Sequence, residues 1–217
     1  MWIILPGFLA GFLHVLMGPD HLAAVSPLAI ENKDKSWKVG LKWGLGHTGG
    51  VFVIGLLVIL FREIIPVDIV SAFSERIVGI VLIGIGIWGL QNIFRKKIHI
   101  HEHDGIKHFH LHNPKIGSEK KNHFHTHTAL FIGIIHGLAG SSHLLGVLPA
   151  LALPTQIQAA AYLLSFGTGT IIAMIFFSQM LGITASKFAG KGSNLYKKLS
   201  ISFSGLAIAV GIFWLLF

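Results

Sequence analysis

The chain has 217 residues, of which 53% are hydrophobic and only 12% are charged, and its mean hydropathy is +0.71. Soluble domains carry about 25% charged residues, so the composition excludes a soluble domain and indicates an integral protein of the lipid bilayer. There is no cysteine, which excludes disulfides, thiolate metal sites and thiol redox chemistry. We interpret the formal net charge of +8 as a signal of membrane orientation, and we expect no nucleic-acid partner.

Six apolar stretches are long enough to cross a bilayer as helices, which takes about 20 residues each. In chain order they are Trp2–Ile30, Val39–Phe61, Ile69–Phe94, Thr128–Leu153, Ala159–Ile183 and Leu199–Phe217. The 26 glycines suit close packing of such helices. Because the first positive charge is Lys33, we expect no secretory signal peptide. The predicted fold class is therefore an all-α integral membrane protein with six transmembrane helices.

The first stretch carries polar groups that are costly in lipid. His14, Asp20 and His21 lie in a segment that is otherwise apolar apart from Ser26, where a charged group costs about 3 kcal/mol or more unless it has a partner or a task. Gly18-Pro19 precedes the carboxylate, and proline removes a backbone donor and clashes with the carbonyl four residues back. We therefore predict a break at Gly18-Pro19 and a functional site beside it.

Basic residues predict the orientation in the membrane. Every lysine and arginine except Arg62 and Arg76 lies around the first, third and fifth connections. By the positive-inside rule, these three connections are cytoplasmic and both termini lie outside. We expect a multi-pass protein of the cell (inner) membrane.

The second half of the chain repeats the first. The segment Gly133 to His143 resembles Gly11 to His21, with a His pair seven residues apart in both. Gly46-His47-Thr48-Gly49 resembles Phe166-Gly167-Thr168-Gly169, and Gly86-Ile-Trp88 resembles Gly211-Ile-Phe-Trp214. Three helices per unit is an odd number, so the sequence predicts two inverted repeats, 1–94 and 128–217, as in many secondary transporters. Chance likeness among glycine-rich helices is the alternative.

Between the halves lies a histidine-rich loop, 95–127, which we expect to be cytoplasmic. It holds nine of the 14 histidines, namely His99, His101, His103, His108, His110, His112, His123, His125 and His127. Such a tract is typical of a multidentate, low-affinity sink for borderline metals that is mobile without metal. A solvated linker with incidental histidines is the alternative.

Five histidines fall in the apolar stretches: His14, His21, His47, His136 and His143. A single histidine there is often a packing residue, but five without lysine or arginine favour a metal path. Imidazole suits nickel, cobalt, zinc and copper(II), whereas magnesium or calcium would need clustered oxygens, and these stretches offer only Asp20. The candidate metal ligands are therefore His14, Asp20, His21, His47, His136 and His143.

The spacing of the first pair leaves two arrangements open. Residues seven apart lie about 10.5 Å apart along a straight helix. Either the break at Gly18-Pro19 brings His14 and His21 into one site with Asp20, and with His47 nearby, or the two histidines are successive stations. Asp20 could instead cap the half-helix that begins after the break.

These motifs resemble those of the nickel/cobalt transporter family. Its members pair a His-x4-Asp-His helix with a Leu-Gly-His-Ser/Thr helix, here His14 with Asp20-His21 and then Leu45-Gly-His-Thr48. The stretch His136 to Ser141 resembles the small urease-accessory type nickel permeases more closely, and the loop resembles that of related efflux proteins. Two features differ: the spacer has five residues instead of four, and Phe166-Gly-Thr-Gly stands where longer permeases have Gly-Phe-Asp-Thr.

The resemblance implies transport of nickel or cobalt ions, with the first-helix His and Asp residues and the second-helix His essential for recognition. We expect uptake by alternating access, with no cofactor besides the transported ion and with cytoplasmic metallochaperones as candidate partners. Efflux, or a membrane metal sensor or delivery scaffold that transports nothing, are the alternatives. A His-Glu-x-x-His motif and intramembrane Ser-Lys or Asp-Asp pairs are absent from the sequence, so no enzyme is expected.

Overall fold

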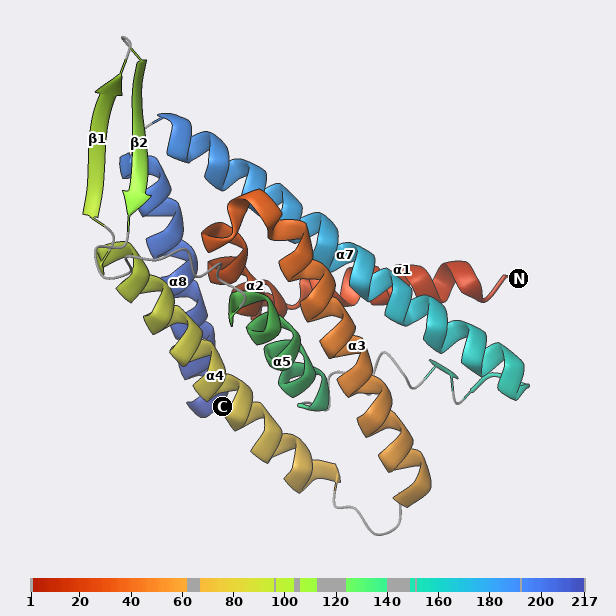
Figure 1. The fold of residues 1–217 in the computed structure, drawn as a ribbon. Coiled ribbons are helices and arrows are strands. Elements are labelled where there is room, and N and C mark those ends of the chain that lie inside the picture. Colours follow the sequence, from red (N-terminus) through yellow and green to blue (C-terminus); the bar gives the residue numbers. More distant parts are fainter. Residues whose placement is uncertain are drawn as a thin grey trace.

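The structure is a computed structural model of the chain. It describes residues 2–61, 67–95, 97–103, 106–112, 124–139, 149–150, 152–191 and 193–216. Within these ranges the fold consists of helices and one two-stranded hairpin (Figure 1).

The first apolar stretch is broken as predicted. Helix α1 covers Ile4–Met17 and α2 covers Pro19–Glu31, and the two are bent by 72° at Gly18. Proline opens α2 at a position where its missing N–H is not needed, so the break costs no helical hydrogen bond within α2. Residues 23–30 of α2 are all buried, so this half-helix is enclosed on every side.

The next two helices follow the predicted stretches. After the short 3-10 helix η1 (Lys33–Lys35), α3 runs over Ser36–Phe61 and α4 over Val67–Arg95. Both extend the apolar stretches by a few residues at one end or both. Their ends therefore differ little from the sequence prediction.

Part of the histidine-rich loop is a hairpin, where we expected a mobile tract. Strands β1 (Lys97–His103) and β2 (Ile106–His112) pair antiparallel, with His99 opposite His110 and His101 opposite His108. Histidine alternates with apolar residues in this segment, which is a strand period of two. The register therefore assigns six histidine positions to one face of the hairpin: His99, His101, His103, His108, His110 and His112.

The second half departs from prediction in its helix ends. Helix α5 covers Phe124–Leu138, so the expected continuous helix Thr128–Leu153 is wrong. In the sequence Gly140 stands two residues after Leu138, and a glycine just past the last helical residue is a common helix stop. Helices α7 (Gln156–Lys191) and α8 (Ser193–Leu216) are longer than predicted, so Lys187 and Lys197 lie on helices and not in a connection.

Close helix pairs build the bundle, and glycines allow their close approach. Helix α1 packs along α7, α3 lies between α5 and α7, and α4 packs along α8 (Figure 1). A methyl group on Gly11 would collide with the Phe166 carbonyl, and one on Gly133 would collide with the Trp43 carbonyl. The hairpin projects at the end of the bundle where α7 ends and α8 begins (Figure 1).

The outer faces of the bundle are apolar. Large exposed side chains include Leu5, Ile157 and Phe213, as expected where lipid replaces water. Among the described residues, three helical segments are long and apolar enough to cross a membrane: Glu75–Arg95, Gln156–Ala189 and Asn194–Leu216. The bent pair α1 and α2 makes a fourth if it counts as one span.

Candidate metal centre

The break between α1 and α2 positions the first polar residues of the site. Gly18 is extended (φ −83°, ψ 105°), and its missing side chain leaves room for two others. A methyl group at Gly18 would collide with the His21 ring and would lie 2.9 Å from Asp20 Oδ1. Glycine is therefore required here by close approach and not by a left-handed backbone.

Asp20 joins the two halves of the chain. It lies in the first turn of α2, where a carboxylate is favoured by the helix dipole. His21 Nδ1 donates to Asp20 Oδ1 at 2.9 Å, and His136 Nε2, from α5, donates to Asp20 Oδ2 at 3.0 Å. Helix α2 has no side-chain cap, so the capping role considered for Asp20 is wrong.

The cluster consists of Asp20 and four imidazoles, and His21 lies at the centre of the imidazoles. The His21 ring centroid lies 4.8 Å from that of His14, 4.9 Å from that of His47 and 4.8 Å from that of His136. The bend between α1 and α2 thus removes the 10.5 Å axial separation expected for His14 and His21 in a straight helix. Asp20, His21, His47 and His136 are buried, whereas His14 is half-buried and is the most accessible member.

The cluster divides into two groups that share His21. Ligand atoms of His14, His21 and His47 lie within 4.8 Å of one another, and so do those of Asp20, His21 and His136. Such groups of three could each hold a divalent ion. Five of the six predicted membrane ligands are therefore brought together, and the sixth, His143, lies outside the described residues.

The loop histidines do not join this cluster where the structure describes them. Six lie on the hairpin strands. His125 and His127 belong to the first turn of α5, where His127 is exposed, and His123 lies outside the described residues. The loop is therefore a second, separate group of candidate ligands.

Two aromatic side chains at the cluster were missed in the sequence. Trp43 is fully buried and stacks on His47, with ring centroids 4.8 Å apart and an interplanar angle of 11°. It also lies 5.6 Å from His21 and 5.4 Å from His136, and Phe166 lies 5.7 Å from His14. The spacing of four residues between Trp43 and His47 on one helix was the available signal.

The requirement for glycine at position 18 gives a first prediction. In Gly18→Ala, the added methyl group displaces His21 and Asp20 while the rest of the bundle is untouched. We expect nickel or cobalt affinity to fall about 10–100-fold, the usual cost of disturbing groups that orient a ligand. Isothermal titration of the purified protein in detergent measures this.

Gly49→Ala is the matched control, because a methyl group there meets no atom of the described residues within 4 Å. Unchanged affinity in Gly18→Ala would contradict the assigned role of the glycine.

Comparison with known proteins connects this geometry to a family. The family described as the cytochrome c biogenesis protein transmembrane region matches residues 3–213. No solved structure matches the chain. The family match covers both halves and the cluster between them.

Three relatives illustrate the range of the family. The chloroplast protein FOR GROWTH AND FERTILITY 1 of Arabidopsis thaliana is 35% identical over 210 residues, covering 95% of this chain, which spans only 56% of that relative's length. The urease accessory protein UreH of Bacillus sp. is 34% identical over 192 residues, or 87% of this chain and 80% of UreH. A protein of Methanocaldococcus jannaschii named as a nickel/cobalt efflux system is 33% identical over 100 residues, 44% of each chain.

The names of the bacterial and the archaeal relative agree with the motifs around His14, Asp20, His21 and His47. This chain contains no cysteine, which excludes thiol chemistry in it. The apolar helices agree with a membrane protein. The chain belongs to the family of the cytochrome c biogenesis transmembrane region and, within it, to the UreH-like branch of nickel/cobalt permeases.

Proposed function

We propose that the protein carries nickel or cobalt ions across the membrane by alternating access. The observation that carries the proposal is the cluster of four imidazoles and one carboxylate, all buried except the half-buried His14, drawn from both halves of the chain. Imidazole nitrogen suits nickel and cobalt, and a buried carboxylate at this depth needs a task. We propose no enzymatic role and no cofactor besides the transported ion.

The hydrogen bonds suggest how the cluster would hold an ion. His21 donates from Nδ1 to Asp20, so it would bind metal through Nε2, in the common carboxylate–histidine–metal arrangement. His14 and His47 would complete a three-histidine site on that side. On the other side, Asp20 would itself be a ligand together with His136. Because the two groups share His21, an ion could pass from one side of its ring to the other.

Repeated contacts support six transmembrane helices in two inverted repeats. In α4 and α8, Gly86 packs on the Ser204 carbonyl, while Gly211 packs on the Gly79 carbonyl. The two contacts are equivalent at an offset of 125, because Gly86 then corresponds to Gly211 and Gly79 to Ser204. Because α4 and α8 are antiparallel, a twofold axis that exchanges them runs across the helices, as inverted repeats require.

The inner helices follow the same rule with a slightly different offset. Gly11 against Phe166 corresponds to Gly133 against Trp43, at offsets of 122 for α1 and 123 for α3. These contacts favour pairing Gly46 with Gly169, three residues away from the alignment of the glycine motifs. The inverted units 1–94 and 128–217 and the connecting loop 95–127 remain our proposal for the domain organisation.

We propose uptake into the cell, with the lysine-rich connections and the histidine-rich loop in the cytoplasm and both termini outside the inner membrane. The basic residues support this placement of the loop, and the likeness of the Asp20-His21 pair to that of the nickel permeases supports uptake. The likeness to a protein named as an efflux system favours export as the second candidate. Cytoplasmic metallochaperones would receive the imported ion.

Metal-resolved flux in proteoliposomes tests the function and its direction together. Nickel, cobalt, zinc and manganese are supplied in turn on one side, and a dye reports arrival on the other. Transport requires nickel or cobalt to cross faster than in protein-free liposomes. A protein that binds nickel but moves no ion would instead be a sensor or delivery scaffold, and transport would be rejected.

The hairpin supports the loop as a metal-binding site of its own. His99 and His110 are directly opposite, as are His101 and His108, and residues opposite each other in an antiparallel pair have Cβ atoms about 5 Å apart. We propose that these two pairs bind ions between the strands. The remaining loop histidines, His103, His112, His123, His125 and His127, would add weaker ligands.

Exchanging neighbours in β1 tests this proposal without changing composition. The double variant Ile100→His, His101→Ile moves one histidine to the other face, opposite Phe109. We expect it to lose about one of the two paired sites, since each pair needs both imidazoles. Equilibrium dialysis of the full-length protein with nickel measures the bound ions per chain.

The control is Ile100→Phe, Phe109→Ile, which exchanges residues across the apolar face and keeps every histidine in place. Equal nickel binding by both double variants would identify the loop as an unstructured sink.

A further inference from the structure

The seam between α3 and α7 is packed differently at its two ends. We call one the lysine end, where α3 begins beside η1 and α7 approaches Lys187, and the other the far end, where α7 begins. At the lysine end, a methyl group on Gly40 would collide with the Met174 carbonyl and lie 2.7 Å from Ser178 Oγ. Ser36 also donates a hydrogen bond to Gln179 Oε1 at 3.2 Å. The lysine end is therefore closed.

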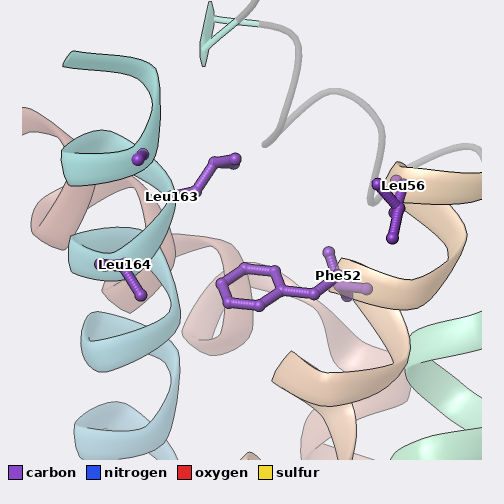
Figure 2. Close-up of a pocket in the computed structure, with 7 residues that line it drawn as sticks. Phe52, Leu56, Leu163 and Leu164 are labelled. Atoms are coloured by element: carbon purple, nitrogen blue, oxygen red, sulfur yellow. The ribbon is translucent and has the colours of Figure 1, made fainter. Parts of the chain in front are cut away.

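At the far end, the same two helices line a partly open cavity of about 340 Å³. Figure 2 shows Phe52 of α3 and Leu163 of α7 pointing into the space between the helices. All the residues that line it are apolar: Val51, Phe52, Gly55, Leu56, Ala160, Leu163 and Leu164. The far end is therefore open between the side chains of the described residues.

Equivalent positions of the two repeats form these two ends. The contact of Gly44 with Ile171 and that of Gly167 with Thr48 are related by the offset of 123. The same offset relates Gly40 to Leu163. It also pairs the cavity residues Val51 and Gly55 with Met174 and Ser178, which close the lysine end.

If the two repeats were identical, the two ends of the α3–α7 seam would be packed alike. The observed difference in packing therefore reflects the conformation of the protein and the different residues at the equivalent positions 40 and 163. Glycine at position 40 lets the helices touch, whereas leucine at position 163 holds them apart. Unequal ends around a central site are what alternating access requires.

We propose that the cavity is the vestibule through which a hydrated divalent cation reaches the histidine cluster, and that the α3–α7 seam is the gate. This proposal rests on the proposed transport function. Water occupies about 30 Å³ per molecule in the liquid, so the cavity has room for an ion with six waters. Its described walls are apolar and offer the ion no ligand, so the first ligands on this path among the described residues are the imidazoles. Such walls can also dewet to close the path.

The distance to the cluster is short. Phe52 lies five residues from His47 on α3, about 7.5 Å along the helix axis. Between them, Thr48 donates a hydrogen bond to the Gly167 carbonyl at 3.5 Å, which ties α3 to α7. If this hydrogen bond opened, the vestibule would be continuous with the cluster. When α3 and α7 then separate at the lysine end, they would close together at the far end.

The chain contains no cysteine, so single cysteines can report access. Leu163→Cys places a thiol in the vestibule, and Ser178→Cys places one at the closed lysine end. A water-soluble, membrane-impermeant thiosulfonate is applied to each side of oriented vesicles. We expect Cys at position 163 to react from one side only and at least about tenfold faster than Cys at position 178, which packing protects.

Nickel flux is measured in the same vesicles, and labelling at position 163 is expected to block it. Ala160→Cys serves as a second vestibule variant should Leu163→Cys fold poorly. Reaction with a lipid-soluble maleimide but not with the charged reagent would mean that lipid fills the cavity, and would overturn the vestibule.

Equal labelling at positions 163 and 178 alongside normal flux would overturn the gate alone. Absence of nickel flux in the unlabelled protein would reject the transport function, and the cation passage with it.

Discussion

Replacing Asp20 by Asn is expected to abolish nickel and cobalt transport while leaving the fold intact. Asparagine keeps the size of the side chain and can still hydrogen-bond to His21 and His136, whose ring nitrogens can donate or accept. It removes the only carboxylate of the cluster. Loss of a group that orients a ligand costs about 10–100-fold in affinity, and a group that also serves as a ligand should cost more.

The stability of this variant is expected to move the other way. Burying a carboxylate within the membrane is costly even when it is hydrogen-bonded, and functional groups are often kept at the expense of stability, so the neutral amide should keep or raise the Tm. Thermal unfolding in detergent and nickel flux in proteoliposomes measure the two effects on one preparation. A lowered Tm with flux retained would show that Asp20 serves the structure and not the ion.

Ser26→Ala is the matched control for Asp20→Asn. Ser26 is buried on the same helix, and its hydroxyl donates to the Leu22 carbonyl within α2. The cluster does not include it, so flux should be unchanged.

Local chemistry in the sequence predicted the parts of the site that lie on the broken first stretch. Gly18-Pro19 predicted the bend, because proline cannot continue the hydrogen bonding of α1. The polar residues His14, Asp20 and His21 were conspicuous because lipid makes them costly. Spacing alone could not decide between one site and two stations, since the answer depends on the angle of the bend.

The contribution of His136 could be expected from the repeat, but its bond to Asp20 could not. That contact depends on how closely α5 packs against α3, which small residues such as Gly133 and Gly137 allow. Trp43 was overlooked because a tryptophan in an apolar stretch resembles any core residue. Its spacing of four residues from His47 was the available signal, and the stacking on His47 shows its place at the cluster.

Helix ends and the hairpin were predicted less well. The continuous helix expected through Gly140 overlooked that glycine as a helix stop signal in the sequence. The hairpin was missed because the histidines were considered as metal ligands, while their alternation with Ile98, Ile100, Phe109 and Leu111 was a strand pattern. In both cases the sequence held a local signal, the glycine or the alternation, and the apolar run or the histidine content was given more weight.

His21→Ala is expected to have the largest effect of any single histidine. His21 contacts His14, His47 and His136 and belongs to both candidate ligand groups, whereas His14 and His136 each belong to one. Its removal should therefore damage both sites. We expect nickel affinity to fall by more than the roughly 100-fold that is lost when a residue that only orients a metal ligand is removed. His14→Ala and His136→Ala should each leave one group intact and retain weaker binding.

The comparison of these three variants also decides whether the sites act in sequence. If the ion passes between overlapping sites, His14→Ala and His136→Ala each slow flux but still bind one ion at equilibrium. In His21→Ala, nickel binding by the cluster and flux are both lost, as measured by titration and proteoliposome assays. Leu28→Ala, on the same helix, controls for the cavity left by a buried side chain, which costs about 2–5 kcal/mol of stability without touching a ligand. If His21→Ala bound and transported nickel as Leu28→Ala does, His21 could not be the shared ligand.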